Sequence, residues 1–166
     1  AQNKFKGLGI ALITPFKSDG EVDYEADLPD LVEISDTEWR GFPVYYGNDG
    51  RNTLPSADEK KILKKMLVER VAGRVPLLMG CGGNNTAAVL KLKEGDWSGI
   101  DGILSVCPYY NKPSQEGLYQ HFKTVSEHSP LPIILYNVPG RTGVNMTAAT
   151  TIRIAGDFPN VIGIKE

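Results

Sequence analysis

The stretch Val161-Ile162-Gly163-Ile164-Lys165-Glu166 is a short apolar run that predicts a β-strand with a lysine at its end. It is the last of six such runs in the chain. The other five are residues 9–14, 41–46, 75–79, 100–106 and 131–136. Strands that are apolar on both faces are typical of a parallel sheet with helices covering both sides. The runs therefore predict an α/β protein.

Helix signals occupy the segments between these runs. Glu59 completes a capping box three residues after its N-cap, and apolar residues then recur at helical spacing as far as Gly73. Pro29 interrupts the first helical segment, which therefore starts late or is kinked. The residues expected to cap the later helices are Ser56, Asn85 or Thr86, Ser114 and Thr147.

Two folds accommodate this alternation, an open doubly wound sheet and a (β/α) barrel. An open sheet favours a glycine-rich phosphate turn after the first strand, and residues 14–17 contain no glycine. Polar and aromatic residues follow nearly every run, as they do at the catalytic end of a barrel. We predict an incomplete (β/α) TIM-type barrel of six parallel strands and five helices, forming one partial-barrel domain over residues 1–166.

The composition narrows the function classes. The chain has 166 residues, 41% of them apolar, and a net charge of −2, which is too little charge to favour nucleic acid or an anionic membrane as a partner. No signal peptide or apolar run of about 20 residues is present, so a cytoplasmic location is expected.

Cys81 and Cys107 do not make a disulfide framework. His121 and His128 have no acidic or cysteine partner at ligand spacing, so no metal is predicted. No cofactor is expected either.

The lysine at the end of the last run has two interpretations. Lys165 is either the first solvated residue after a core strand, or an amine whose pKa desolvation lowers so that it attacks a carbonyl. In a barrel the strand ends meet at one mouth, which would bring Tyr136 and Arg141 close to Lys165. A tyrosine hydroxyl can move protons and an arginine can clamp a carboxylate, so this set suits Schiff-base chemistry on a keto acid. The alternative for Arg141 is that it only caps a loop.

Three motifs carry a resemblance. Residues 107–117 begin Cys-Pro-Tyr-Tyr-Asn, residues 136–143 read Tyr-Asn-Val-Pro-Gly-Arg-Thr-Gly, and residues 163–166 read Gly-Ile-Lys-Glu. Together they resemble the dihydrodipicolinate synthase family, in the class I aldolase superfamily that also holds N-acetylneuraminate lyase. The Pro-Gly-Arg-Thr-Gly string favours the synthase over the lyase.

The resemblance implies a complete (β/α) barrel that condenses pyruvate with aspartate semialdehyde through a lysine Schiff base, in lysine biosynthesis. It implies that Lys165 is the Schiff-base lysine, Tyr136 the proton-relay tyrosine and Arg141 the carboxylate binder. It also implies that Tyr110 is the tyrosine that this family inserts into the site of a neighbouring subunit. Tyr110 as an ordinary aromatic residue on the rim remains the alternative.

One loop departs from the family pattern. Residues 47–51 read Gly-Asn-Asp-Gly-Arg, where the family usually has Gly-Thr-Thr-Gly-Glu. Asn48 and Asp49 thus occupy the substrate-binding positions of two threonines that complete the relay and bind the carboxylate. Asn48 can form hydrogen bonds but cannot pass a proton as a hydroxyl does. Asp49 would repel a carboxylate, unless it pairs with Arg51 or Lys165.

Length is the second departure, because a barrel of this type needs about 250 residues. We expect the last two β/α units and the C-terminal helices of the family to be missing, as in a shortened, resequenced and engineered derivative.

The resemblance and the two departures leave two candidate functions. The first is a class I aldolase or lyase acting on a pyruvate-type keto acid, with activity reduced or lost. The second is an inactive partial-barrel scaffold that self-associates. In both cases we expect a homodimer or a higher homo-oligomer.

Overall fold

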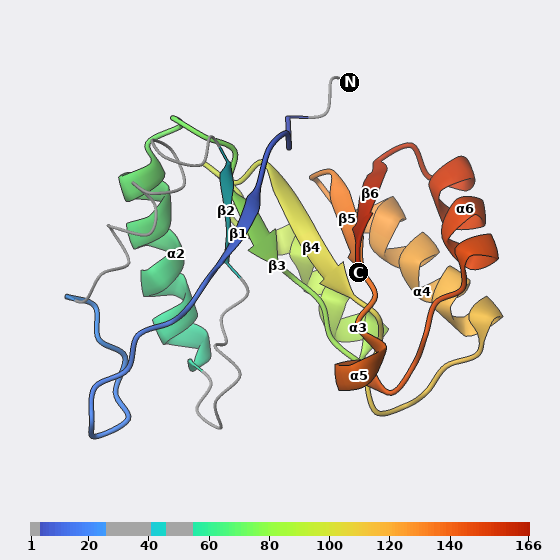
Figure 1. Ribbon diagram of the computed structural model, residues 1–166, viewed down its shortest axis with the longest axis horizontal. Helices are drawn as coiled ribbons and strands as arrows, with labels where there is room; N and C mark the ends of the chain where they lie inside the picture. The colour runs from blue at the N-terminus through green and yellow to red at the C-terminus, as the bar shows by residue number, and fades with distance from the viewer. Residues whose placement is uncertain (1–3, 26–40, 46–54) are drawn as a thin grey trace. The chain divides into compact units, whose positions relative to one another are not determined.

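The computed structural model describes residues 4–25, 41–45 and 55–166. In these residues six parallel strands follow one another in chain order, with helices between them (Figure 1). This confirms the predicted α/β fold class, an incomplete TIM-type barrel. The strands are β1 (Gly9–Leu12), β2 (Phe42–Tyr45), β3 (Leu78–Gly80), β4 (Gly102–Val106), β5 (Ile133–Tyr136) and β6 (Val161–Lys165).

Five α-helices lie in the described residues, and a 3₁₀ helix, η1 (Leu90–Glu94), follows the second of them. They are α2 (Ala57–Val71), α3 (Thr86–Val89), α4 (Gln115–His128), α5 (Pro139–Thr142) and α6 (Ala148–Asp157). The helix expected around Pro29 and the loop at residues 47–51 lie outside the described residues. None of the helices within the described ranges is long and apolar enough to cross a membrane.

The chain divides into two compact units, and the first comprises residues 1–79 with 98–101. Within it β1 pairs with β2 and β2 with β3, all in parallel. Helix α2 begins at the predicted capping box: the Glu59 N–H donates to the Ser56 hydroxyl (3.3 Å), and the Ser56 N–H donates to the Glu59 carboxylate (2.7 Å). The helix ends at Ala72, which adopts the left-handed conformation, one residue before Gly73. Whether the two units form one domain, as the sequence predicts, stays a prediction.

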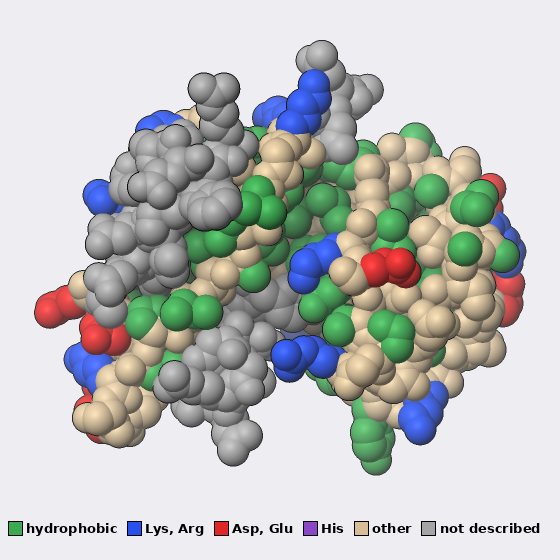
Figure 2. Space-filling model, viewed as in Figure 1, with side chains coloured by type: hydrophobic (Ala, Val, Ile, Leu, Met, Phe, Trp, Pro, Cys, Tyr) green, Lys and Arg blue, Asp and Glu red, His purple; other side chains and the backbone are tan. Residues whose placement is uncertain are grey.

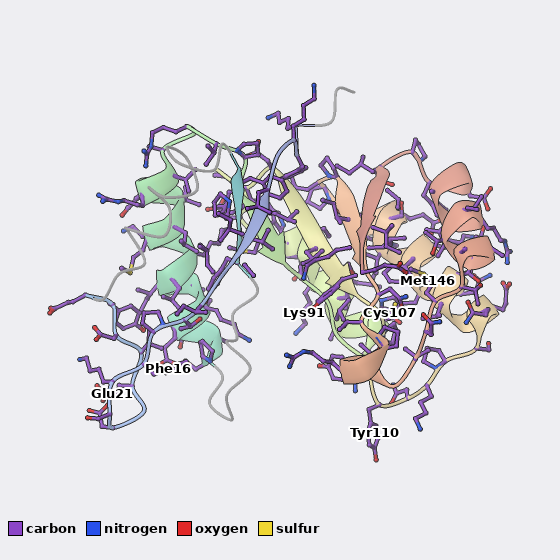
Figure 3. The ribbon with its side chains drawn as sticks, in the orientation of Figure 1. Phe16, Glu21, Lys91, Cys107, Tyr110 and Met146 are labelled. Atoms are coloured by element: carbon purple, nitrogen blue, oxygen red, sulfur yellow. The ribbon has the colours of Figure 1, made fainter. Side chains whose placement is uncertain are left out.

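The second unit comprises residues 80–97 with 102–166. Here β4 pairs with β5 and β5 with β6, again in parallel. Ser114 and Thr147 cap α4 and α6 as predicted, and Asn85 caps α3. In the core of this unit, apolar side chains of the strands pack against apolar side chains of the helices. Figure 3 labels two core residues, Cys107 and Met146. Its fully buried side chains include Ile103, Cys107, Leu118, Phe122, Val125, Ile133, Leu135 and Ile154.

Burial differs among the strands of the second unit. All five residues of β4 are buried. In β6 only Val161 is buried, and the residues from Gly163 to Lys165 are exposed. The prediction of strands covered on both faces is therefore confirmed for β4 and wrong for β6. Both cysteines of this unit are free thiols.

Candidate functional site

The carboxyl ends of β4, β5 and β6 are joined by hydrogen bonds that continue past the strands. The Cys107 N–H donates to the Tyr136 carbonyl oxygen (3.0 Å), and the Asn137 N–H donates to the Lys165 carbonyl oxygen (3.0 Å). Figure 1 shows the short helix α5 and the C-terminus at this same end of the unit. Residues at the carboxyl ends of three different strands are thus fixed to one another by backbone bonds.

Two of the predicted site residues meet here. Lys165 lies directly opposite Tyr136 in the β5–β6 register, and its Nζ lies 4.2 Å from the centre of the Tyr136 ring. An ammonium group over a tyrosine ring is an attractive arrangement. Tyr136 is half-buried, whereas Lys165 is exposed. Figure 2 shows basic and acidic side chains at the surface where Figure 1 marks the end of the chain, in agreement with the exposure of Lys165 and Glu166.

An irregularity in β6 sets this pairing. Ile133 pairs with Val161, but Ile134 pairs with Gly163, so β6 carries one extra residue, Ile162, at that point. A shift of one residue reverses the side of the sheet to which every later side chain points. The extra residue therefore brings the side chain of Lys165, and not that of Ile164, opposite Tyr136.

Arg141 lies on a one-turn helix that the sequence analysis missed. Helix α5 starts at Pro139, and Gly143 ends it in the left-handed conformation with φ of +71°. Proline at a first helical position, with glycine after the last, was the signal that could have predicted it. The Arg141 side chain is exposed, and no residue in the described ranges forms a hydrogen bond or ion pair with its guanidinium.

Tyr110 lies in the loop between β4 and α4. It adopts the left-handed conformation with φ of +70°, and its N–H donates to the Thr142 carbonyl oxygen (3.3 Å). Its side chain is 85% exposed, and Figure 3 shows it pointing away from the neighbouring side chains. Asn48 and Asp49 lie outside the described residues, so their place relative to Lys165 stays a prediction.

Sequence reasoning also missed Asn137, which follows Tyr136 and is only 3% exposed. Its side-chain amide donates to the Asn145 side-chain oxygen (2.8 Å) and to the Glu166 carboxylate (3.1 Å). Its side-chain oxygen accepts the Met146 N–H (3.0 Å). A polar residue directly after a strand that carries a predicted catalytic residue was the available signal in the sequence.

Other reactive groups of this unit are held in neutral forms. Burial raises the pKa of the Cys81 and Cys107 thiols to about 11, so both stay protonated near neutral pH. Burial lowers the pKa of His121 to about 4, and its Nδ1 lies 2.8 Å from the Thr86 hydroxyl. Groups of three or more acidic, histidine or cysteine residues able to hold a metal ion are absent from residues 4–25, 41–45 and 55–166. The arrangement that stands out chemically is the exposed amine beside a tyrosine.

Known proteins resemble this chain along its whole length. The model of the dihydrodipicolinate synthetase family matches residues 4–166. A 4-hydroxy-tetrahydrodipicolinate synthase of Parabacteroides distasonis is 53% identical over 100% of the chain and 56% of its own length. One of Thermotoga neapolitana is 47% identical over 98% of the chain and 55% of its own length. The chain thus spans about half the length of the curated relatives that it matches.

Solved structures agree with this. A monomeric dihydrodipicolinate synthase variant superposes with a TM-score of 0.89 at 44% identity, over 98% of this chain and 54% of its own. The chloride-inhibited dihydrodipicolinate synthase of Acinetobacter baumannii, complexed with pyruvate, gives a TM-score of 0.87 at 40% identity, over 97% of this chain and 55% of its own. By sequence and by structure, this chain belongs to the dihydrodipicolinate synthetase family.

Proposed function

We propose that this chain carries the Schiff-base centre of a dihydrodipicolinate synthase, in which Lys165 binds pyruvate covalently for condensation with aspartate semialdehyde in lysine biosynthesis. The observation that carries the proposal is the exposed Lys165 amine, 4.2 Å from the centre of the Tyr136 ring at the paired ends of β5 and β6. The structural relative that was solved with pyruvate supports the choice of keto acid.

The proposed chemistry begins with attack by the neutral Lys165 amine on the ketone carbon of pyruvate. A C–N bond forms as the C=O double bond opens, the oxygen takes one proton and the nitrogen gives one up, which gives a carbinolamine. The carbinolamine then loses water to leave the imine. Each step moves a proton, and Tyr136 is the proposed group that delivers and accepts these protons. The exposed guanidinium of Arg141, on the helix that follows β5, is proposed to hold the pyruvate carboxylate.

Turnover is proposed to be reduced or lost. Asn48 and Asp49 replace hydroxyl side chains of the relay, and Asp49 would add a negative charge where the substrate carboxylate binds. Imine formation depends most directly on Lys165, so the first step is expected to survive better than the complete condensation. The expected cytoplasmic location stays a prediction.

The test is to mix the protein with pyruvate, trap the imine with borohydride and weigh the intact protein. We expect one adduct per chain, placed on Lys165 by peptide mapping and absent in Lys165→Ala. Lys61→Ala is the matched control, because Lys61 is a well-exposed lysine on α2 that pairs with the nearby Asp58. An adduct that is equally abundant in Lys165→Ala would contradict the proposal.

The second candidate, an inactive self-associating scaffold, rests on exposed apolar surface. Tyr110 is 85% exposed and Ile152 of α6 is 72% exposed, and tyrosine is enriched in interfaces between subunits. It predicts no adduct, together with cooperative unfolding and a dimeric or larger mass in light scattering. A monodisperse monomer would contradict the proposed homo-oligomer, whichever function holds.

A further inference from the structure

We propose that Asn137 is a positioning residue that holds Lys165 over the Tyr136 ring and ties both to the segment after the Arg141 helix. The inference rests on the proposed function for its meaning in catalysis, but its geometric part stands on the structure alone. Asn137 itself is not a catalytic residue in this proposal, because it acts through its neighbours.

The first contacts join Asn137 to the end of β6. Its backbone N–H donates to the carbonyl oxygen of Lys165, and its side-chain amide donates to the carboxylate of Glu166 (3.1 Å). The first bond holds the backbone of Lys165, and the second holds the side chain of Glu166. Beyond Val161, β6 is not buried, so these polar contacts add to its pairing with β5 in fixing its carboxyl end.

The other contacts join Asn137 to the segment that follows α5. The side-chain amide donates to Asn145 (2.8 Å), and the side-chain oxygen accepts the Met146 N–H (3.0 Å). The thiol of Cys107, directly after β4, also lies 3.9 Å from that oxygen. One side chain thus links the ends of three strands to the segment through which α5, with Arg141, is connected to α6.

Only an amide of this length fits these contacts. The site needs two N–H donors and one acceptor on the same short side chain, and aspartate offers acceptors only when ionised. Asn137 is 3% exposed, so water does not replace the lost bonds. In Asn137→Asp, the new carboxylate would also face that of Glu166. The end of β6 would then be pushed away from β5, and Lys165 would leave the Tyr136 ring.

The geometric test does not need pyruvate. The lysines are reductively methylated with ¹³C-formaldehyde, and the Lys165 methyl signal is assigned with Lys165→Arg. In the parent protein we expect an upfield ring-current shift, because the amine lies over the face of Tyr136. In Asn137→Asp we expect that shift to collapse to the position of exposed lysines, while circular dichroism shows a folded protein.

Ser126→Ala is the matched control, since Ser126 is a buried polar residue of the same unit whose hydroxyl bonds to Asn160, just before the amino end of β6, whereas Lys165 lies at the carboxyl end of that strand. It should lower stability and leave the Lys165 shift unchanged. A Lys165 shift that persists in Asn137→Asp, or that is missing from the parent, would overturn the positioning role.

The catalytic test compares borohydride trapping rates at saturating pyruvate. Asn137→Asp should trap at least about ten-fold more slowly than Ser126→Ala, because a misplaced reacting group costs that much or more. The double variant Asn137→Asp with Glu166→Gln should recover part of the rate, since the glutamine amide can donate to the new carboxylate. If the double variant traps pyruvate as slowly as Asn137→Asp, the loss of rate comes from general destabilisation of the protein, and this would contradict the proposal. Absence of an adduct in the parent would contradict the proposed function and not the geometric result.

Discussion

Strands β4 and β6 have the same length and both pair with β5, yet their environments are opposite. Every residue of β4 is buried, and Ile103 and Leu104 are at most 1% exposed. In β6 burial stops after Val161, and Ile164 is 38% exposed. Both strands pair with β5, but β4 is also bonded on its other side, where the Cys81 N–H donates to the Leu104 carbonyl oxygen (2.9 Å), so the difference reflects this second backbone neighbour as well as what covers each strand.

The contrast indicates that β4 contributes mainly to stability, whereas β6 carries the lysine of the proposed chemistry. A strand buried along its length contributes apolar packing, which is the main favourable contribution to folding. A strand exposed at its carboxyl end keeps a lysine accessible to a substrate and must be fixed by hydrogen bonds. In the proposed site, Lys165 would depend on its register with Tyr136 and on the contacts of Asn137, whereas Ile103 is held by the core.

The sharpest way to break the comparison is a pair of identical truncations. Ile103→Ala should lower the free energy of unfolding by about 3 to 4 kcal/mol, because it leaves a cavity in a closed core. Ile164→Ala should lower it by less than about 1 kcal/mol, since its side chain is already partly in water. Urea unfolding followed by circular dichroism measures both, and equal losses would show that the two strands are covered alike.

The next largest effect should appear in the reaction with pyruvate at the paired ends of β5 and β6. Tyr136→Phe keeps the ring beneath Lys165 but removes the hydroxyl, so pyruvate trapping should slow by about 100-fold, the low end of what positioned proton transfer contributes. The Lys165 ring-current shift should persist in this variant. A trapping rate equal to that of the parent would assign the proton transfers to another group.

Acid should lower the free energy of unfolding by a smaller amount, through the buried ring of His121. The pKa of His121 falls from 6.5 to about 4 on folding because the ring is buried, so its contribution to stability is complete above pH 6.5 and is lost as the pH falls towards 4. Lowering the pH from about 7 to about 5 should cost about 2 kcal/mol through this group. His121→Gln should lose less stability than the parent over the same range, as measured by urea unfolding at each pH. Identical pH dependence in both proteins would contradict this role.

Local signals in the sequence predicted much of the fold. Ser56 with Glu59, Ser114 and Thr147 predicted three helix starts correctly, because a cap involves residues within three positions of each other. The apolar runs predicted all six strands, although each strand is shorter than its run and β3 ends one residue beyond its run. Helix α5 was missed because a single turn is too short to show apolar periodicity.

What the sequence by itself determined is the order of strands and helices, the family, and the choice of Lys165, Tyr136 and Arg141 as candidate site residues. The tertiary structure decided which of them meet. It placed Lys165 opposite Tyr136 through one extra residue in β6, and it revealed Asn137 as the residue that joins Asn145 and Glu166. The physical reason is the separation along the chain of the residues that interact. Caps and periodicity act between near neighbours, whereas strand register, burial and the contacts of a buried amide depend on residues that are distant in the chain.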